Sequence, residues 1–123
     1  MNDQLNIASF WNTTLKSSRS HASGAARRCP GPFGELILSE AAKFCEQTVP
    51  QSHEEYSKRT QQSMSLTTKI SSISHAAFAA RRHPKIEDSI LNETKAFCDR
   101  VSLSDDVTLE SMALTQAISN MCF

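Results

Sequence analysis

The sequence predicts an all-α protein in which a unit of one long and one short helix occurs twice in tandem and is followed by a C-terminal helix. Residues 13–30 (TTLKSSRSHASGAARRCP) align without a gap on residues 67–84 (TTKISSISHAAFAARRHP), with 12 identities in 18 positions. Apolar residues recur at helical spacing in the predicted helices, and no segment alternates apolar and polar residues between hairpin turns. Such a tandem would form a compact helical bundle or a very short α-solenoid.

The repeat continues beyond its proline, after a spacer that is one residue shorter in the second copy. The matching positions are then Ile37-Leu38 with Ile90-Leu91, Glu40 with Glu93, and Phe44-Cys45 with Phe97-Cys98. We interpret residues 1–123 as a single all-α domain with repeats at about 9–50 and 63–103 and a partial third unit at 104–123. A chain of this length can bury roughly two-thirds of its unfolded surface.

The first unit is predicted to form helices at about 5–28 and 34–48. Apolar faces are expected in both helices, and they consist of Ile7, Phe10, Trp11 and Leu15 in the first and Ile37, Ala41, Phe44 and Cys45 in the second. The intervening Cys29-Pro30-Gly31-Pro32 is typical of a turn, because neither proline nor glycine supports a helix interior.

The second unit opens with a capping box, in which Ser52 is the N-cap and Glu55 follows three residues later. Two apolar lines of period seven run along the predicted helix: Tyr56, Ser63, Ile70 and Ala77, and beside them Leu66, Ile73 and Ala80. Pro84 should end this helix near His83, and a shorter helix at about 86–101 should follow.

The C-terminal helix is expected to start after Ser104 as N-cap, with Asp105 and Asp106 in its first turn. Its sequence repeats the start of the second unit, since SMALT at 111–115 corresponds to SMSLT at 63–67. We therefore expect this helix to cover the apolar edge that the second unit leaves open.

Composition argues against several classes of protein. The net charge is zero, so no overall field attracts nucleic acid or a membrane. No apolar run is longer than the five residues 76–80, which predicts neither a transmembrane helix nor a signal-peptide core. Four cysteines in this context favour reduced thiols in an intracellular, cytoplasmic protein over a disulfide framework.

Charge is nevertheless distributed unevenly along the chain. The segment between Gln4 and Gly34 contains basic residues and no acidic ones, whereas acidic residues dominate from Lys85 onward. The basic and acidic ends could pair within the fold or between copies.

Two Arg-Arg pairs occupy equivalent positions, Arg27-Arg28 and Arg81-Arg82. They could clamp phosphates or nucleic acid with their planar guanidinium groups. Alternatively they serve only as C-terminal helix residues that bond free carbonyls, or pair with Glu40 and Glu93. The second interpretation is favoured, because zero net charge leaves little non-specific affinity for nucleic acid.

The histidines and cysteines raise the question of a metal site. His21 and His75 are equivalent, and His83 corresponds to Cys29, but no pair of ligands has the spacing of a known zinc motif. We expect no metal and no cofactor, and interpret Ser-His-Ala as a contact between two long helices.

No catalytic constellation is evident. Cys45 and Cys98 stand beside phenylalanines on apolar faces, which protects a thiol, and only Cys29 follows two arginines at a helix end. The three glycines form no phosphate loop. The sequence therefore predicts a protein that is not an enzyme.

Phe10 and Trp11 could anchor a partner if exposed, or fill the open end of the bundle if buried. We expect a non-enzymatic protein–protein interaction protein (an adaptor, inhibitor or assembly component) that presents a helical groove to another protein. A nucleic-acid- or phosphate-binding protein using the Arg pairs and a self-assembling structural protein are the alternatives, and a homo-oligomer is compatible with each.

Overall fold

The computed structural model describes residues 2–122, and the side chains of residues 6–122, and it confirms the all-α prediction. The described residues contain five α-helices and one 3-10 turn, and no strand. In chain order these are α1 (Asn2–Arg28), α2 (Pro32–Cys45), α3 (His53–Arg82), η1 (Pro84–Ile86), α4 (Glu87–Arg100) and α5 (Val107–Met121).

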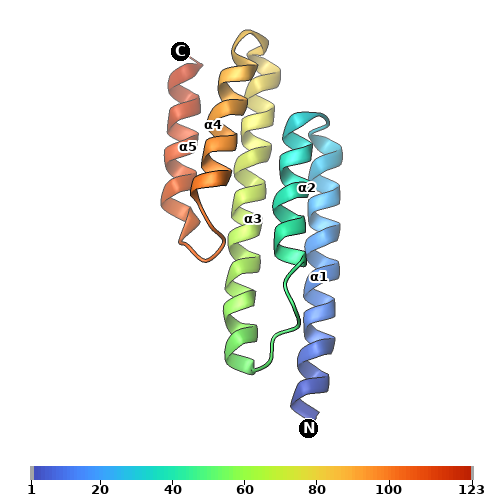
Figure 1. Ribbon diagram of the computed structural model, residues 1–123. Coiled ribbons are helices and arrows are strands. Elements are labelled where there is room, and N and C mark those ends of the chain that lie inside the picture. Colours follow the sequence, from blue (N-terminus) through green and yellow to red (C-terminus); the bar gives the residue numbers. More distant parts are fainter. Residues whose placement is uncertain (1, 123) are drawn as a thin grey trace.

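Consecutive helices run in opposite directions, so α1, α3 and α5 point one way and α2 and α4 the other (Figure 1). The long helix α3 packs against all four of the others. α2 also packs against α1, α4 against α5, and the two short helices touch each other. The molecule is a compact bundle in which α1, α3 and α5 form one row and the short helices lie along it. A 27- or 30-residue helix followed by one of 14 residues occurs twice.

Two glycines shape the turn from α1 to α2. Gly31 has a φ of 95°, a conformation that side chains disfavour, and Pro32 begins the next helix. A Cβ atom on Gly34 would lie 2.4 Å from the carbonyl oxygen of Cys29, so only glycine allows the start of α2 to approach the end of α1.

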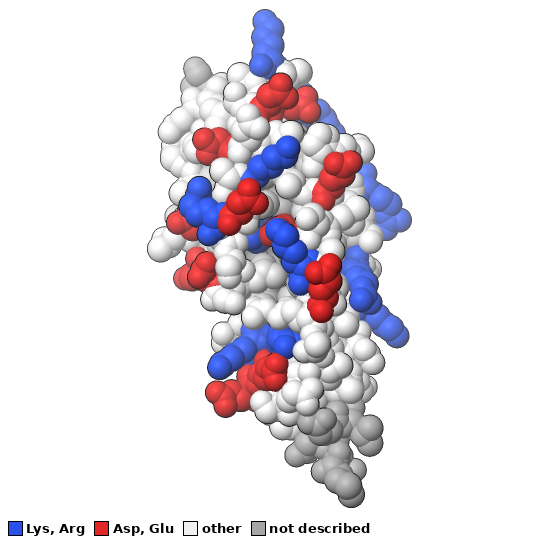
Figure 2. Space-filling model, viewed as in Figure 1, with Lys and Arg blue, Asp and Glu red and all other residues white. Residues whose placement is uncertain are grey.

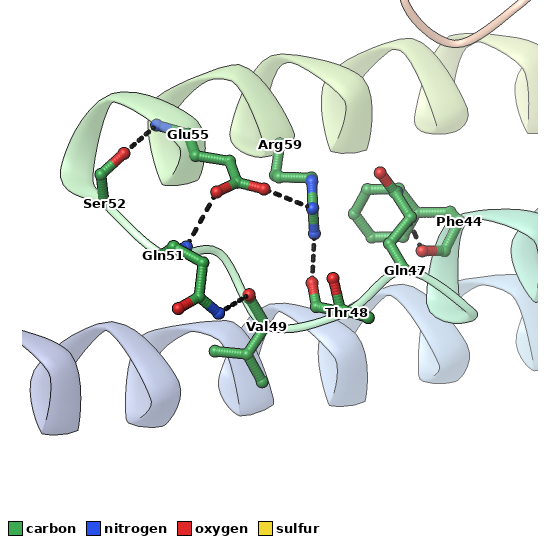
Figure 3. Close-up of polar contacts among 8 residues, drawn as sticks. All are labelled: Phe44, Gln47, Thr48, Val49, Gln51, Ser52, Glu55 and Arg59. Carbon is green, nitrogen blue, oxygen red and sulfur yellow. Dashed lines mark hydrogen bonds and ion pairs between the residues drawn. The ribbon is translucent and has the colours of Figure 1, made fainter.

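The connection from α2 to α3 is held by side chains of both its ends (Figure 3). The hydroxyl of Ser52 accepts from the backbone N–H of Glu55 at 3.1 Å, which confirms the predicted cap. The Glu55 carboxylate accepts from the N–H of Gln51 at 2.8 Å and from Arg59 at 2.7 Å. Arg59 in turn donates to the carbonyl of Thr48. The loop is therefore tied to the first two turns of α3.

The connection from α3 to α4 and the start of α5 differ in detail from the sequence prediction. α3 ends at Arg82 as expected before Pro84, but a 3-10 turn, Pro84–Ile86, precedes α4. The N-cap of α5 is Asp106, whose carboxylate accepts from the N–H of Thr108 at 3.0 Å. The prediction of Ser104 as the cap was wrong, because residues 102–105 form a turn of their own, in which the Asp105 carboxylate accepts from the N–H of Ser102.

The core contains two pairs of residues that the repeat aligns, Ile37 with Ile90 and Phe44 with Phe97. Phe44 and Phe97 are fully buried, as predicted for the inward faces of the short helices. α1 and α3 contribute small residues to this core, namely Ala22, Ala25, Ala76 and Ala80. Small side chains allow neighbouring helices to approach closely.

Candidate protein-binding face

The short helices carry many exposed charged side chains. Lys, Arg, Asp and Glu side chains are scattered over the face viewed in Figure 2. The exposed charged residues of these two helices are Glu35, Lys43, Glu87, Asp88, Glu93, Lys95, Asp99 and Arg100. These charged side chains favour contact with water.

The exposed side of the three odd-numbered helices is different, and we call it the long-helix face. On α1 it comprises Phe10, Thr13, Ser17 and His21; on α3, Thr60, Met64, Thr67, Ser71, His75 and Phe78; and on α5, Met112, Thr115 and Ser119. These residues recur every three or four positions, which places them on one side of each helix. None of them is an acid, a lysine or an arginine, but charged residues border the face: Arg28 beside His21 and His75, and Lys58, Asp105 and Asp106 beside Met64.

Three large apolar side chains project from equivalent positions of this face. Phe10, Met64 and Met112 are 51%, 68% and 63% exposed, and the internal repeat aligns all three with one another. The ring of Phe10 lies 6.1 Å from that of Tyr56, across the groove between α1 and α3. The rest of this groove is lined by hydroxyl groups of Ser and Thr residues. Exposed apolar side chains of this size are typical of a surface that another macromolecule covers.

The two candidate anchors differ in burial. Phe10 is exposed, but Trp11 is only 1% exposed and therefore cannot anchor a partner. Its ring lies 5.4 Å from that of Phe44, and the guanidinium of Arg59 lies 5.2 Å from its centroid. Trp11 packs inside the bundle near the end of α2. The alternative interpretation, in which these aromatic residues fill the bundle, is therefore confirmed for Trp11 and not for Phe10.

The four arginines are all exposed, at the C-terminal ends of α1 and α3. Arg81 donates to the carbonyl oxygen of Arg28 at 3.3 Å, so it bonds the last residue of a neighbouring helix. Its guanidinium also lies 5.6 Å from the ring centroid of Phe78. Arg28 lines a cleft between α1 and α3, while Arg27 does not line that cleft. The predicted pairing of these arginines with Glu40 was wrong, because two lysines hold that carboxylate.

Glu40 and Lys69 form a buried ion pair that the sequence analysis missed. Their side chains are 4% and 2% exposed, and the ammonium lies 2.5 Å from the carboxylate. Lys69 also donates to the carbonyl of Cys98 at 3.2 Å, and the second Glu40 oxygen accepts from Lys43 at 2.8 Å. The hydrogen bond to Glu40 and its negative charge raise the pKa of Lys43. The ion pair and the hydrogen bond to Cys98 together connect α2, α3 and α4.

A cleft of about 440 Å³ opens beside this ion pair, between the short helices and the segment 101–104. Lys69 has no charged counterpart in the first unit, where Leu15 is aligned with it. This difference was the signal available in the sequence, since an isolated lysine within an apolar helical stripe requires a carboxylate partner.

Burial protects the thiols of Cys45 and Cys98, as the sequence predicts. Burial raises the pKa of the Cys98 thiol to about 11, and the nearby charge of Glu40 acts in the same direction. Burial also raises the pKa of Cys45, against the influence of Arg19. Cys29 is buried at the end of α1. Thiols that remain protonated near neutral pH are poor nucleophiles.

The equivalent histidines, His21 and His75, line the same cleft between α1 and α3. Among residues 6–122, no group of three His, Cys, Asp or Glu side chains is placed to hold a metal ion. His83 lies elsewhere, beside Pro84 at the end of α3.

Comparison with known proteins identifies no relative. In the part of the chain that the structure describes, no helix is both long enough and apolar enough to cross a membrane. No family of known proteins, no curated protein and no solved structure matches this chain.

Proposed function

We propose that this protein is a non-enzymatic interaction protein that binds a partner protein through the long-helix face. The observation that carries the proposal is that Phe10, Met64 and Met112, which the internal repeat aligns, are 51%, 68% and 63% exposed on α1, α3 and α5. Exposed apolar groups of this kind gain free energy when a partner removes them from water.

The chemistry of the face suggests the kind of partner. Parallel helices form grooves between them, and grooves accept amphipathic helices of partner proteins. The hydroxyl groups on either side of these three apolar side chains can donate or accept hydrogen bonds at the rim of such an interface.

Affinity capture with charge-inserting variants tests the proposal. The wild-type protein and the variants Met64→Glu and Phe10→Glu would be used as bait in a lysate of the source organism, and captured proteins identified by mass spectrometry. Leu38→Glu is the matched control, since Leu38 is 48% exposed but lies on α2. A partner of the long-helix face is retained by the wild type and the control and lost from both face variants.

Quantitative binding then completes the test. Calorimetry with the identified partner should give an affinity at least about tenfold weaker for Met64→Glu, as expected when an apolar contact is replaced by a buried charge. Equal capture by all four baits would argue against this face as the binding surface.

Self-association is a second candidate function, and the exposed residues along the outer edge of α5 support it. Leu109, Met112, Ala113, Gln116 and Asn120 are exposed there, and none is charged. Sedimentation velocity over a wide concentration range would show a dimer that Leu109→Glu abolishes. A monomer at every concentration would remove this candidate.

A further inference from the structure

The cleft between the C-terminal halves of α1 and α3 contains two histidines and an arginine. His21 and Arg28 reach it from α1 and His75 from α3, and Ser71, Ser74 and Phe78 complete its wall. Its volume is about 300 Å³, which accommodates a small ion and its first hydration shell. His21, Ser71, His75 and Phe78 belong to the long-helix face, but Phe10, Met64 and Met112 do not line the cleft.

The repeat explains why these groups meet. Ser-His-Ala occurs at residues 20–22 and again at residues 74–76, in helices that run in the same direction (Figure 1). Two turns further along α1, Arg28 ends the helix, and its carbonyl is held by Arg81. This hydrogen bond fixes the end of α1 against α3 and brings a second guanidinium close to the cleft.

Among the residues that the structure describes, no acidic side chain lines the cleft. α1 contains no Asp or Glu from residue 6 to its end, and α3 contains none after Glu55. The acids at this end of the neighbouring helices, Glu35 of α2 and Glu87 and Asp88 of α4, lie outside the cleft. The groups of α1 and α3 that can carry charge at this end are His21, His75 and the arginines at positions 27, 28, 81 and 82. All of them become or remain positive, so the potential in the cleft favours an anion, and more strongly as the histidines gain protons.

A metal ion fits the same residues less well. Two imidazoles provide only half of a tetrahedral coordination shell, and the third charged group lining the cleft is a guanidinium. A guanidinium repels a cation, but it donates paired hydrogen bonds to the oxygens of a phosphate or sulfate. The serine hydroxyls can donate to the remaining oxygens.

We infer that this cleft binds a dianionic oxyanion, a phosphate group, between the imidazoles of His21 and His75 and the guanidinium of Arg28. Affinity increases as the pH falls from 8 to 6, because protonated imidazoles donate two charge-assisted hydrogen bonds. Bound anion in turn stabilises the protonated histidines.

Proton NMR titration of the four histidines tests this site. Sodium sulfate is the probe, since its charge is constant between pH 5 and 8.5, and sodium chloride at equal ionic strength is the reference. Sulfate should raise the titration midpoints of His21 and His75 by about 0.5 pH unit or more. His53 and His83 lie outside the cleft and report any general effect of the salt. Equal shifts at all four histidines, or none in the cleft, would overturn the inference.

Neighbouring arginines provide a matched pair of variants. Arg28→Gln should weaken sulfate binding at pH 6 about tenfold, whereas Arg27→Gln, one residue earlier and outside the cleft, should leave it nearly unchanged. Equal losses in both variants would mean a diffuse effect of charge and contradict a defined site.

Inorganic phosphate and phosphoserine, compared at one pH, then distinguish the source of the group. Tighter binding of phosphoserine assigns the cleft to a phosphorylated side chain, and equal binding assigns it to the free ion.

Discussion

The burial of Lys69 depends on side chains from three helices. Its ammonium meets the Glu40 carboxylate from α2 and the Cys98 carbonyl from α4. That carbonyl lies in the last turn of α4, where carbonyls have no partner within their own helix and the helix dipole is negative. Sequence alone cannot establish such a site, because burying a charge is favourable only when partners on other elements are in place.

Removing one member of this pair should be far worse than removing both. Glu40→Leu leaves the ammonium of Lys69 buried without its counter-ion and should lower the free energy of unfolding by about 3–5 kcal/mol. Adding Lys69→Met should recover most of this loss, although the Cys98 carbonyl then loses its donor. Urea unfolding followed by circular dichroism measures both variants. A double variant as unstable as Glu40→Leu would show that packing, not the unpaired charge, determines the loss.

The two aligned phenylalanines should be equally costly to truncate. Phe44→Ala and Phe97→Ala each remove a fully buried ring and should lower the free energy of unfolding by about 3–5 kcal/mol. Phe10→Ala is the control, since half of that ring is already exposed, and it should cost much less. Urea unfolding measures the three losses. A change near zero in the free energy of unfolding for Phe44→Ala and Phe97→Ala would contradict their place in the core.

At the scale of the helices, the sequence was sufficient to predict all five. Proline and glycine mark the turns, and the capping box at Ser52 marks the start of α3. The start of α5 was missed by two residues because Ser102, Ser104, Asp105 and Asp106 are all suitable caps. Which of them caps the helix depends on hydrogen bonds within the preceding turn, which the sequence does not reveal.

Two glycines provide a prediction at this scale. Gly24 lies inside α1, where a Cβ atom would meet only the end of the Arg28 side chain at 3.7 Å. Gly24→Ala should therefore stabilise the protein by about 0.5–1 kcal/mol. Gly34→Ala should destabilise it by about 1–3 kcal/mol, since its Cβ atom would collide with the backbone oxygen of Cys29. Thermal unfolding of the two variants compares them directly, and the same sign for both would refute this account of the turn.

For the whole molecule, the set of exposed residues depends on how the helices pack. The sequence showed that basic residues are concentrated near the N-terminus and acidic residues near the C-terminus. It did not reveal that Phe10, Met64 and Met112 are exposed, because exposure depends on which helices cover which. Phe10 and Trp11 are adjacent in the chain, and only the position of α2 and its loop decides that Trp11 is buried. The exposure of Phe10 therefore requires coordinates, whereas the burial of Phe44 and Phe97 could be predicted from the repeat.

The row of helices also predicts how the molecule opens. α5 packs against α3 and α4, at the opposite side of the bundle from α1, and its buried face includes Leu114 and Ile118. Leu114→Ala leaves a cavity in this contact and should cost about 2–5 kcal/mol. Because the loss is local, hydrogen exchange should accelerate first in α5 and the adjoining part of α4, while α1 and α2 keep their protection. Met112→Ala, on the exposed side of the same helix, should leave the exchange pattern unchanged. Uniform acceleration in all five helices would instead show that the bundle unfolds as one cooperative unit, in which α5 is as essential as the central helix.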